Sequence, residues 1–253
     1  MTYARVEIDG APAPAELLAA AALVNYGHYT TMQIRGRAVR GLGLHLARLD
    51  AATLELFDVP LDPERVRSAL RHCLGDDYAD ATGRITVFDA GGGEPSVMVS
   101  VGEPAEPSMQ PARLRSVRYL RPFAHLKHVG SFAQIYYGVR AERDGYDDAL
   151  LVDDDGAIAE TTIANIAFAD GDDIVWPAAP ALAGVTMQLL APRLGSPRRP
   201  IHLSDLAGVG AAFITNSRGV TPVGQIDEVA IPVDDRLMRR VVEVYDAVPW
   251  DPI

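Results

Sequence analysis

Residues 149–168 read ALLVDDDGAIAETTIANIAF, and this stretch decides the fold. The apolar run at 149–152 is typical of a buried strand, and the acidic segment 153–156 ends it with a turn. Residues 158–168 predict a second strand, in which Glu160 is the single charged residue. An unpaired carboxylate in a buried strand costs free energy, so we expect Glu160 to have a partner.

Helices and strands alternate irregularly on either side of this stretch. Asp62 and Pro63 mark the start of one helix, since aspartate caps helices and proline fits the first helical position. Apolar spacing predicts further helices at 44–56, 131–144, 184–194 and 234–244. Apolar runs predict strands at 84–88, 96–101, 113–120 and 211–215. The pattern indicates a mixed α/β (α+β) protein.

The boundary between two subdomains is expected where Arg121-Pro122 ends a predicted strand. The 253 residues correspond to about 1.7 domains at roughly 150 residues per domain. We therefore expect an N-terminal α/β subdomain at 1–120, a linker at 121–126 and a C-terminal α/β subdomain at 127–253.

Composition excludes several classes of function. The net charge of −11 makes general nucleic-acid binding unfavourable, because an acidic chain repels a phosphate backbone. The most apolar stretch, 17–24, is too short to span a bilayer. Cys73 is the single cysteine, and the pair His125 and His128 lacks a metal-binding motif, so neither a disulfide nor a metal site is expected. With no recognisable targeting segment, we expect a cytoplasmic protein without a membrane partner.

Several separated segments form a pattern when they are taken in order. They are Gly27-His28-Tyr29-Thr30-Thr31, His45-Leu46-Ala47-Arg48-Leu49, Lys127, Ala149-Leu150-Leu151-Val152-Asp153, Glu160-Thr161-Thr162-Ile163-Ala164-Asn165-Ile166, Leu182-Ala183-Gly184-Val185-Thr186 and Thr215-Asn216-Ser217 with Pro222-Val223. Together they resemble the class IV (fold-type IV) enzymes that use pyridoxal 5'-phosphate (PLP), which are the branched-chain and D-amino-acid aminotransferases and the aminodeoxychorismate lyases. The resemblance implies the two-subdomain fold-type IV architecture, with the lysine in the C-terminal subdomain.

The resemblance also implies roles for single residues. Lys127 matches the catalytic Schiff-base lysine, because only lysine supplies an amine that can hold the cofactor and then move a proton. Glu160 matches the acid that keeps the pyridine nitrogen protonated, which makes the ring a better electron sink. Tyr29 matches a substrate-side tyrosine of the D-amino-acid enzymes.

The remaining matches concern the cofactor, and chiefly its phosphate. Arg48 corresponds to the phosphate-binding arginine, whose guanidinium suits a dianion. Val185 and Thr186 open a predicted helix, where backbone N–H groups favour an anion. Asn216 and Ser217 would complete the phosphate site from a following loop. Asn165, in the segment that begins at Glu160, joins the predicted cofactor-binding set.

The chain departs from the family at two positions. Asp89-Ala90 stands where many relatives carry an Arg-Gly pair, whose arginine holds the substrate carboxylate in some aminotransferases. The substitutes considered are Arg118, Arg121 and Arg35. Met187 stands where the family often has arginine.

Three functions within the resemblance remain open. The first is a PLP-dependent aminotransferase acting on a small amino acid and keto acid pair. The second is a 4-amino-4-deoxychorismate lyase that releases pyruvate, which the Thr215-Asn216-Ser217 motif resembles more closely. The third, suggested by Asp89 and Met187, is an altered member that does not use PLP. A different family, such as a metal hydrolase, is a further alternative. The resemblance also implies a homodimer.

Overall fold

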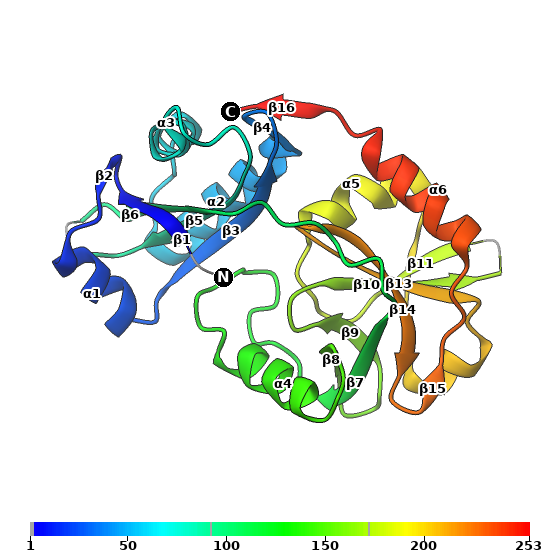
Figure 1. Ribbon diagram of the computed structural model, residues 1–253. Helices are drawn as coiled ribbons and strands as arrows, with labels where there is room; N and C mark the ends of the chain where they lie inside the picture. The colour runs from blue at the N-terminus through cyan, green and yellow to red at the C-terminus, as the bar shows by residue number, and fades with distance from the viewer. Residues whose placement is uncertain (1–2, 92, 172) are drawn as a thin grey trace. The chain divides into compact units, whose positions relative to one another are not determined.

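The computed structural model describes residues 3–91, 93–171 and 173–253. The chain divides into two compact units. The first consists of Met1–Ala105, Leu126–Gly130 and Pro249–Ile253, and the second of Glu106–His125 and Ser131–Val248. Each unit has its own sheet, as the ribbon in Figure 1 shows. Each also has its own buried core.

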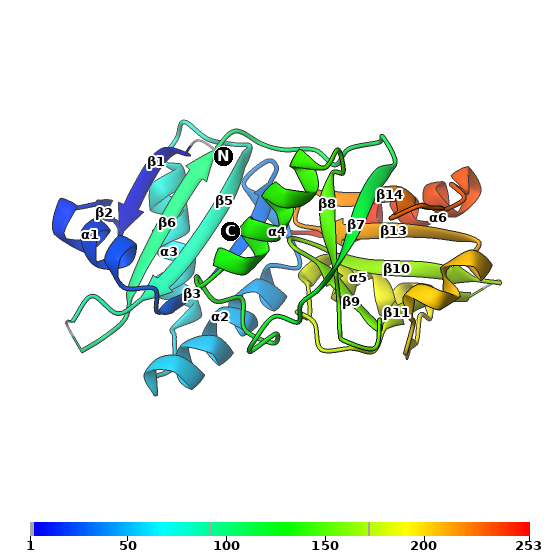
Figure 2. The same ribbon diagram turned by 90° about the horizontal axis from the view of Figure 1, so that it is seen from below.

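The first unit is built on an antiparallel sheet with the strand order β2-β1-β6-β5-β3, whose strands lie side by side in Figure 2. The short strand β16 pairs with β4 and brings the last residues of the chain into this unit. In chain order the elements are β1 (Tyr3–Ile8), β2 (Ala11–Pro12), α1 (Ala15–Leu23), β3 (Gly27–Ile34), β4 (Ala38–Arg40), α2 (Leu42–Phe57), α3 (Pro63–Leu74), β5 (Ala81–Phe88), β6 (Ser96–Gly102) and β16 (Trp250–Pro252).

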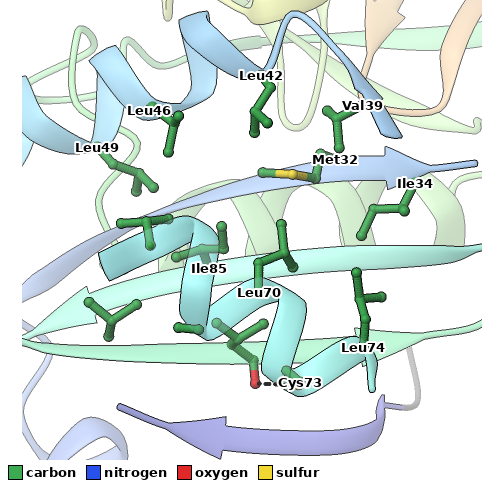
Figure 3. Packing of buried hydrophobic residues seen from close by; sticks show 14 of the residues in the cluster. Met32, Ile34, Val39, Leu42, Leu46, Leu49, Leu70, Cys73, Leu74 and Ile85 are labelled. Carbon is green, nitrogen blue, oxygen red and sulfur yellow. Dashed lines mark hydrogen bonds between the residues drawn. The ribbon is translucent and has the colours of Figure 1, made fainter. Parts of the chain in front are cut away.

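Helices α2 and α3 bury their apolar faces against this sheet. Figure 3 shows Leu42 and Leu49 of α2 and Leu70 of α3 pointing toward Met32 and Ile85 of the strands, in one buried cluster. Burying a side chain of this size fully is worth about 1.5–3 kcal/mol, so the cluster fixes α2 on β3. The predicted cap of α3 is confirmed, because the Asp62 carboxylate accepts the N–H of Glu64 at 2.9 Å.

The second unit contains a mixed sheet with the order β12-β11-β10-β13-β14-β7-β8-β9, and β15 pairs with β14. Strand β7 is parallel to both of its neighbours, β14 and β8. The elements are β7 (Ala112–Arg118), α4 (Phe132–Arg143), β8 (Asp148–Val152), β9 (Ile158–Thr161), β10 (Asn165–Asp170), β11 (Asp173–Pro177), α5 (Val185–Leu194), β12 (Arg198–Arg199), the 3₁₀ helix η1 (Leu203–Gly208), β13 (Ala211–Asn216), β14 (Gly219–Ile226), β15 (Val229–Ala230) and α6 (Asp235–Asp246).

Both faces of this second sheet are buried. Ala167 and Phe213 are opposite each other on β10 and β13 and belong to a cluster with residues of α5 and α6. Their neighbours Ile166 and Ala212 belong to the cluster on the other face, which includes Leu206 of η1. Burial on both faces explains why these strands read as continuous apolar runs.

The stretch 158–168, expected as one strand, forms β9 and β10 with a turn between them. The Thr161 hydroxyl accepts the N–H groups of Ile163 at 3.3 Å and Ala164 at 3.0 Å, so a local side-chain bond replaces the sheet pairing. The mixed α/β fold class is confirmed. Within the described parts of the chain, no helix has the length and apolar character that a bilayer crossing requires.

The observed division differs from the expected subdomain boundaries, for two physical reasons. Strand β7, expected with the N-terminal subdomain, belongs to the second unit because it hydrogen-bonds to β14 and β8. Residues 127–130, expected to begin the C-terminal subdomain, belong to the first unit together with Leu126, because this segment pairs with β3.

A buried carboxyl group joins β8 to the turn that follows β9. Oδ1 of Asp148 accepts the Thr162 hydroxyl at 2.5 Å and the N–H of Ala149 at 2.8 Å. Oδ2 is buried and has no hydrogen-bond partner among the described residues. Burial raises the pKa of Asp148 above its usual value, so the charged form is penalised in the folded protein.

Replacing Asp148 with asparagine is expected to stabilise the protein near pH 8, because the amide oxygen still accepts both bonds and no charge is buried. A raised folded-state pKa gives stability that is present at low pH and lost as pH rises through that pKa. The gain of Asp148→Asn, about 1 kcal/mol or 2–4 °C in melting temperature, should therefore shrink toward pH 4. Melting curves of both proteins across this range measure it, and a pH-independent difference contradicts the explanation.

Candidate functional site

The predicted catalytic lysine lies on a short extended segment that pairs with the edge strand β3. The N–H of Tyr29 donates to the carbonyl of Lys127 at 2.8 Å, and the N–H of Val129 donates to Gly27 at 2.9 Å. His28 and His128 are the paired residues between them. The backbone of Lys127 is therefore fixed by sheet hydrogen bonds, and its side chain starts from a defined position.

Tyr29 lies beside this lysine. The Lys127 Nζ atom is 4.9 Å from the centroid of the Tyr29 ring. The guanidinium carbon of Arg84, from β5, is 3.7 Å from the same centroid. Two cations thus meet one aromatic ring, in the favourable cation–π arrangement.

Arg48 projects from α2 toward two polar side chains. Its guanidinium donates to the Thr30 hydroxyl, which in turn lies 2.7 Å from Nδ1 of His45. Burial, together with the charges of Arg48 and Lys127, lowers the pKa of His45 well below its usual value. His45 is therefore neutral and can accept the Thr30 hydrogen bond at Nδ1, which leaves the Thr30 oxygen to accept from Arg48.

A second histidine on this side is also neutral. Nε2 of His28 lies 3.0 Å from the Thr53 hydroxyl, and burial with the Arg48 charge lowers the pKa of His28 to about 4. Sequence reasoning did not assign a role to His28 or to His45. Because both imidazole rings are neutral, the positive charge of this cluster comes from Arg48 and Lys127. That positive charge favours an anionic ligand.

In the second unit, Glu160 is buried in an ion pair. Its Oε1 atom lies 3.1 Å from the Arg121 guanidinium, and Oε2 accepts the N–H of Leu182 at 3.2 Å. Arg121 also donates to the carbonyl of Ala124 at 2.5 Å. Glu160 thus has a protein partner, and Arg121 is engaged with Glu160.

Asn165 and the loop before α5 fit closely together. The Asn165 amide donates to the Leu182 carbonyl at 2.7 Å. Gly184 lies so near that a Cβ atom there would be 2.1 Å from the Asn165 oxygen. Leu182 therefore connects Glu160, through its N–H, to Asn165, through its carbonyl, and only glycine fits at 184.

The N-terminus of α5 meets the end of β13. Val185 and Thr186 form the first turn of α5, whose leading N–H groups have no intrahelical acceptor. The Thr186 hydroxyl donates to the carbonyl of Asn216 at 2.7 Å, next to Ser217. The Asn216 side chain caps a turn by accepting the N–H of Arg218 at 2.8 Å.

Thr215 adds a hydroxyl donor to this region. It belongs to the Thr215-Asn216-Ser217 motif, but it was not among the predicted site residues. Its hydroxyl oxygen is buried and has no hydrogen-bond partner in the part of the chain described. Thr215 is opposite Asn165 in the sheet, so the two side chains share a face. An orphaned buried hydroxyl beside a helix N-terminus indicates a place for a polar ligand.

The predicted site residues thus form two groups, one in each unit. Tyr29, Arg48 and Lys127 lie in the first unit. The second unit brings together Glu160, Asn165, Val185, Thr186, Asn216 and Ser217. Met187, a departure from the family pattern, is buried in the core beneath α5.

Residues 27–226 match the family model described as amino-transferase class IV. The chain belongs to this family. No curated protein matches the sequence significantly. The predicted family is therefore confirmed, over most of the chain.

Several solved structures share this fold. A protein classed provisionally as a 4-amino-4-deoxychorismate lyase from Legionella pneumophila superposes with a TM-score of 0.84 at 18% identity, covering 94% of this chain and 96% of that one. A fold IV transaminase from Curtobacterium pusillum gives 0.81 at 23%, covering 94% and 91%. A hypothetical aminotransferase from Mycobacterium tuberculosis, with PLP bound, gives 0.81 at 19%, covering 97% and 98%.

In this class IV aminotransferase, Gly184→Ala is expected to displace the Asn165 side chain and break its bond to Leu182. Losing a buried hydrogen bond should lower the free energy of unfolding by about 1–3 kcal/mol. Denaturant unfolding measures the change. The control is Gly43→Ala in α2, where no atom lies within 4 Å of the added Cβ, and alanine should stabilise the helix by about 0.5–1 kcal/mol. Equal shifts in both variants would refute the steric argument.

Proposed function

We propose that this chain is a PLP-dependent aminotransferase that moves an amino group between a small amino acid and a keto acid. One observation carries the proposal. Among 23 lysines and arginines in the sequence, Lys127 is the only lysine, and it is the residue held by sheet hydrogen bonds beside Tyr29. Arginine supplies charge but not a nucleophilic amine, so this position has a chemical purpose.

The residues present fit the cofactor by their donor chemistry. A phosphate dianion needs several N–H and O–H donors and positive charge. The first turn of α5 and the orphaned Thr215 hydroxyl provide the N–H and O–H donors, and Arg48 provides the positive charge. A pyridine ring needs a carboxylate, which Glu160 provides with charge compensation from Arg121.

In the proposal, Arg48, Val185, Thr186, Asn216 and Ser217 bind the phosphate. Glu160 accepts a hydrogen bond from the pyridine nitrogen, while Arg121 compensates the charge of its carboxylate. Asn165 shapes the loop that carries these donors. His45, through Thr30, orients Arg48.

PLP, when bound, draws electrons away from the α-carbon of an amino acid. Lys127 holds the cofactor aldehyde through its Nζ atom and then moves the proton of the substrate α-carbon. His28 and His45 are neutral, so neither ring adds a positive charge near this amine. Tyr29 contacts the substrate next to the amine.

Lys127→Ala and Lys127→Arg are both expected to abolish turnover, because neither side chain can bond to the aldehyde. Borohydride treatment of the PLP-loaded protein should fix the cofactor on the peptide that contains Lys127 in the wild type and in neither variant. Mass spectrometry of the digested protein is decisive, since no other lysine exists. Covalent labelling retained in Lys127→Arg would refute the assignment, and wild-type protein that takes up no PLP would support the PLP-free alternative.

A lyase activity is the second candidate function. The Thr215-Asn216-Ser217 motif favours it. The same cofactor and lysine would serve both reactions. Pyruvate released from aminodeoxychorismate without any keto-acid acceptor would select the lyase, and dependence on an acceptor would select the aminotransferase.

We infer that the active form is a homodimer that uses α4. Phe132, Ile135, Tyr136 and Val139 recur at helical spacing on one face of α4, with exposed fractions of 79%, 63%, 48% and 39%. Apolar stripes of this kind on a helix are usually covered by a partner. A second copy of the chain is the occupant that the family resemblance implies, and a cytoplasmic location is part of the same proposal.

Ile135→Asp is expected to dissociate this dimer, because a carboxylate at the centre of an apolar interface would be desolvated. Sedimentation velocity should show a monomer for this variant and a dimer for the wild type. Leu54→Asp is the control, since Leu54 is a similarly exposed leucine on α2. A wild-type monomer, or dissociation by both variants, contradicts this use of α4.

A further inference from the structure

The residue expected to hold the substrate carboxylate is absent, and the structure shows what Asp89 does instead. Asp89 is exposed and its carboxylate accepts the N–H of Gly91 at 2.7 Å, in a turn after β5. A carboxylate at this position repels another carboxylate. An amino-acid substrate therefore needs a different cation.

Two of the three arginines considered as substitutes are already engaged. Arg121 is buried with Glu160. Arg35 donates to Gln33 at 3.2 Å and to the carbonyl of Ala105 at 3.1 Å, which holds it against its own strand and a loop. Arg118 is exposed at the end of β7.

Arg84 is a half-buried arginine of β5. Its Nε atom donates to the Thr86 hydroxyl at 3.3 Å, and its guanidinium covers the Tyr29 ring. Among the residues that the structure describes, no aspartate or glutamate forms an ion pair with it. A partly desolvated charge gains free energy when an opposite charge arrives.

The geometry around Arg84 suits a carboxylate. Stacking on Tyr29 fixes the guanidinium plane, and Thr86 uses one of its five N–H donors, so the others can form a paired contact with two carboxylate oxygens. Lys127 Nζ faces the same Tyr29 ring. Because the α-carbon of an amino acid bears both its amine and its carboxylate, a carboxylate-binding cation must lie close to the reactive amine.

We propose that Arg84 binds the substrate carboxylate and so restricts the enzyme to amino acids and keto acids rather than simple amines. This rests on the proposed function, since it presumes chemistry at Lys127. Tyr29 acts as the platform that holds Arg84 at a fixed distance from the amine. The arginine lost at position 89 is thus replaced from within β5.

The test compares wild type, Arg84→Gln and Arg84→Lys, with Arg67→Gln on α3 as the control. PLP uptake and borohydride fixation are measured first. Acetate and propionate are then titrated against the absorbance of the bound cofactor, and rates are compared for alanine with ethylamine and for phenylglycine with benzylamine. Within each pair the two amines differ only by the carboxylate.

Arg84→Gln is expected to load the cofactor normally, to bind both carboxylates about 10- to 100-fold more weakly, and to lose its preference for the amino acid over the amine. Arg84→Lys should fall between, because it keeps the charge but not the planar fork. Arg67→Gln should match the wild type.

Unchanged carboxylate affinity in Arg84→Gln, or an equal loss of rate on the amino acid and the amine, would overturn the proposal. If Arg84→Gln does not fold, Arg84→Lys decides, and an undiminished preference for the amino acid in that variant counts against Arg84. Wild-type protein without PLP uptake refutes the proposed function itself, which separates the two failures.

Discussion

Sheet pairing between residues 127–129 and the edge of β3 is the constraint on which the first unit's chemistry depends. Lysine has a long side chain with four rotatable bonds, and its Nζ atom is placed well only if the backbone below it is fixed. The hydrogen bonds from Tyr29 and Val129 provide this. The same pairing covers the exposed edge of β3, so one interaction completes the sheet and places Lys127 beside the Tyr29 ring.

In the second unit, the backbone of Leu182 is the element that positions the predicted site residues, although its side chain is apolar and unreactive. Its N–H donates to Glu160 and its carbonyl accepts from Asn165, so the backbone of one residue fixes an acid on β9 and an amide on β10. Gly184 follows because the close approach to Asn165 leaves no room for a Cβ atom. The loop 182–184 therefore fixes the start of α5 relative to the Glu160 carboxylate.

The sequence predicted most helices and strands correctly, because they follow local patterns, and local motifs likewise led to the predicted site residues. Apolar spacing and the Asp62 cap are local, and so is each motif. The subdomain boundary is not local, since β7 and the segment around Lys127 are assigned by strands far along the chain. Arg121 could not be predicted as the partner of Glu160 for the same reason, because the two residues are far apart in the sequence. The absence of other lysines was a sequence signal, readable by counting alone.

That count has a physical meaning. Arginine stays charged at any pH a protein meets and is a poor nucleophile, so 22 arginines can serve as permanent cations in ion pairs and on surfaces without competing for an aldehyde. The neutral His28 and His45 leave even fewer groups that could exchange protons near Arg48. Charge and reactivity are thereby separated between residue types: arginines, Arg84 among them, supply fixed charge, and one lysine supplies the reactive amine.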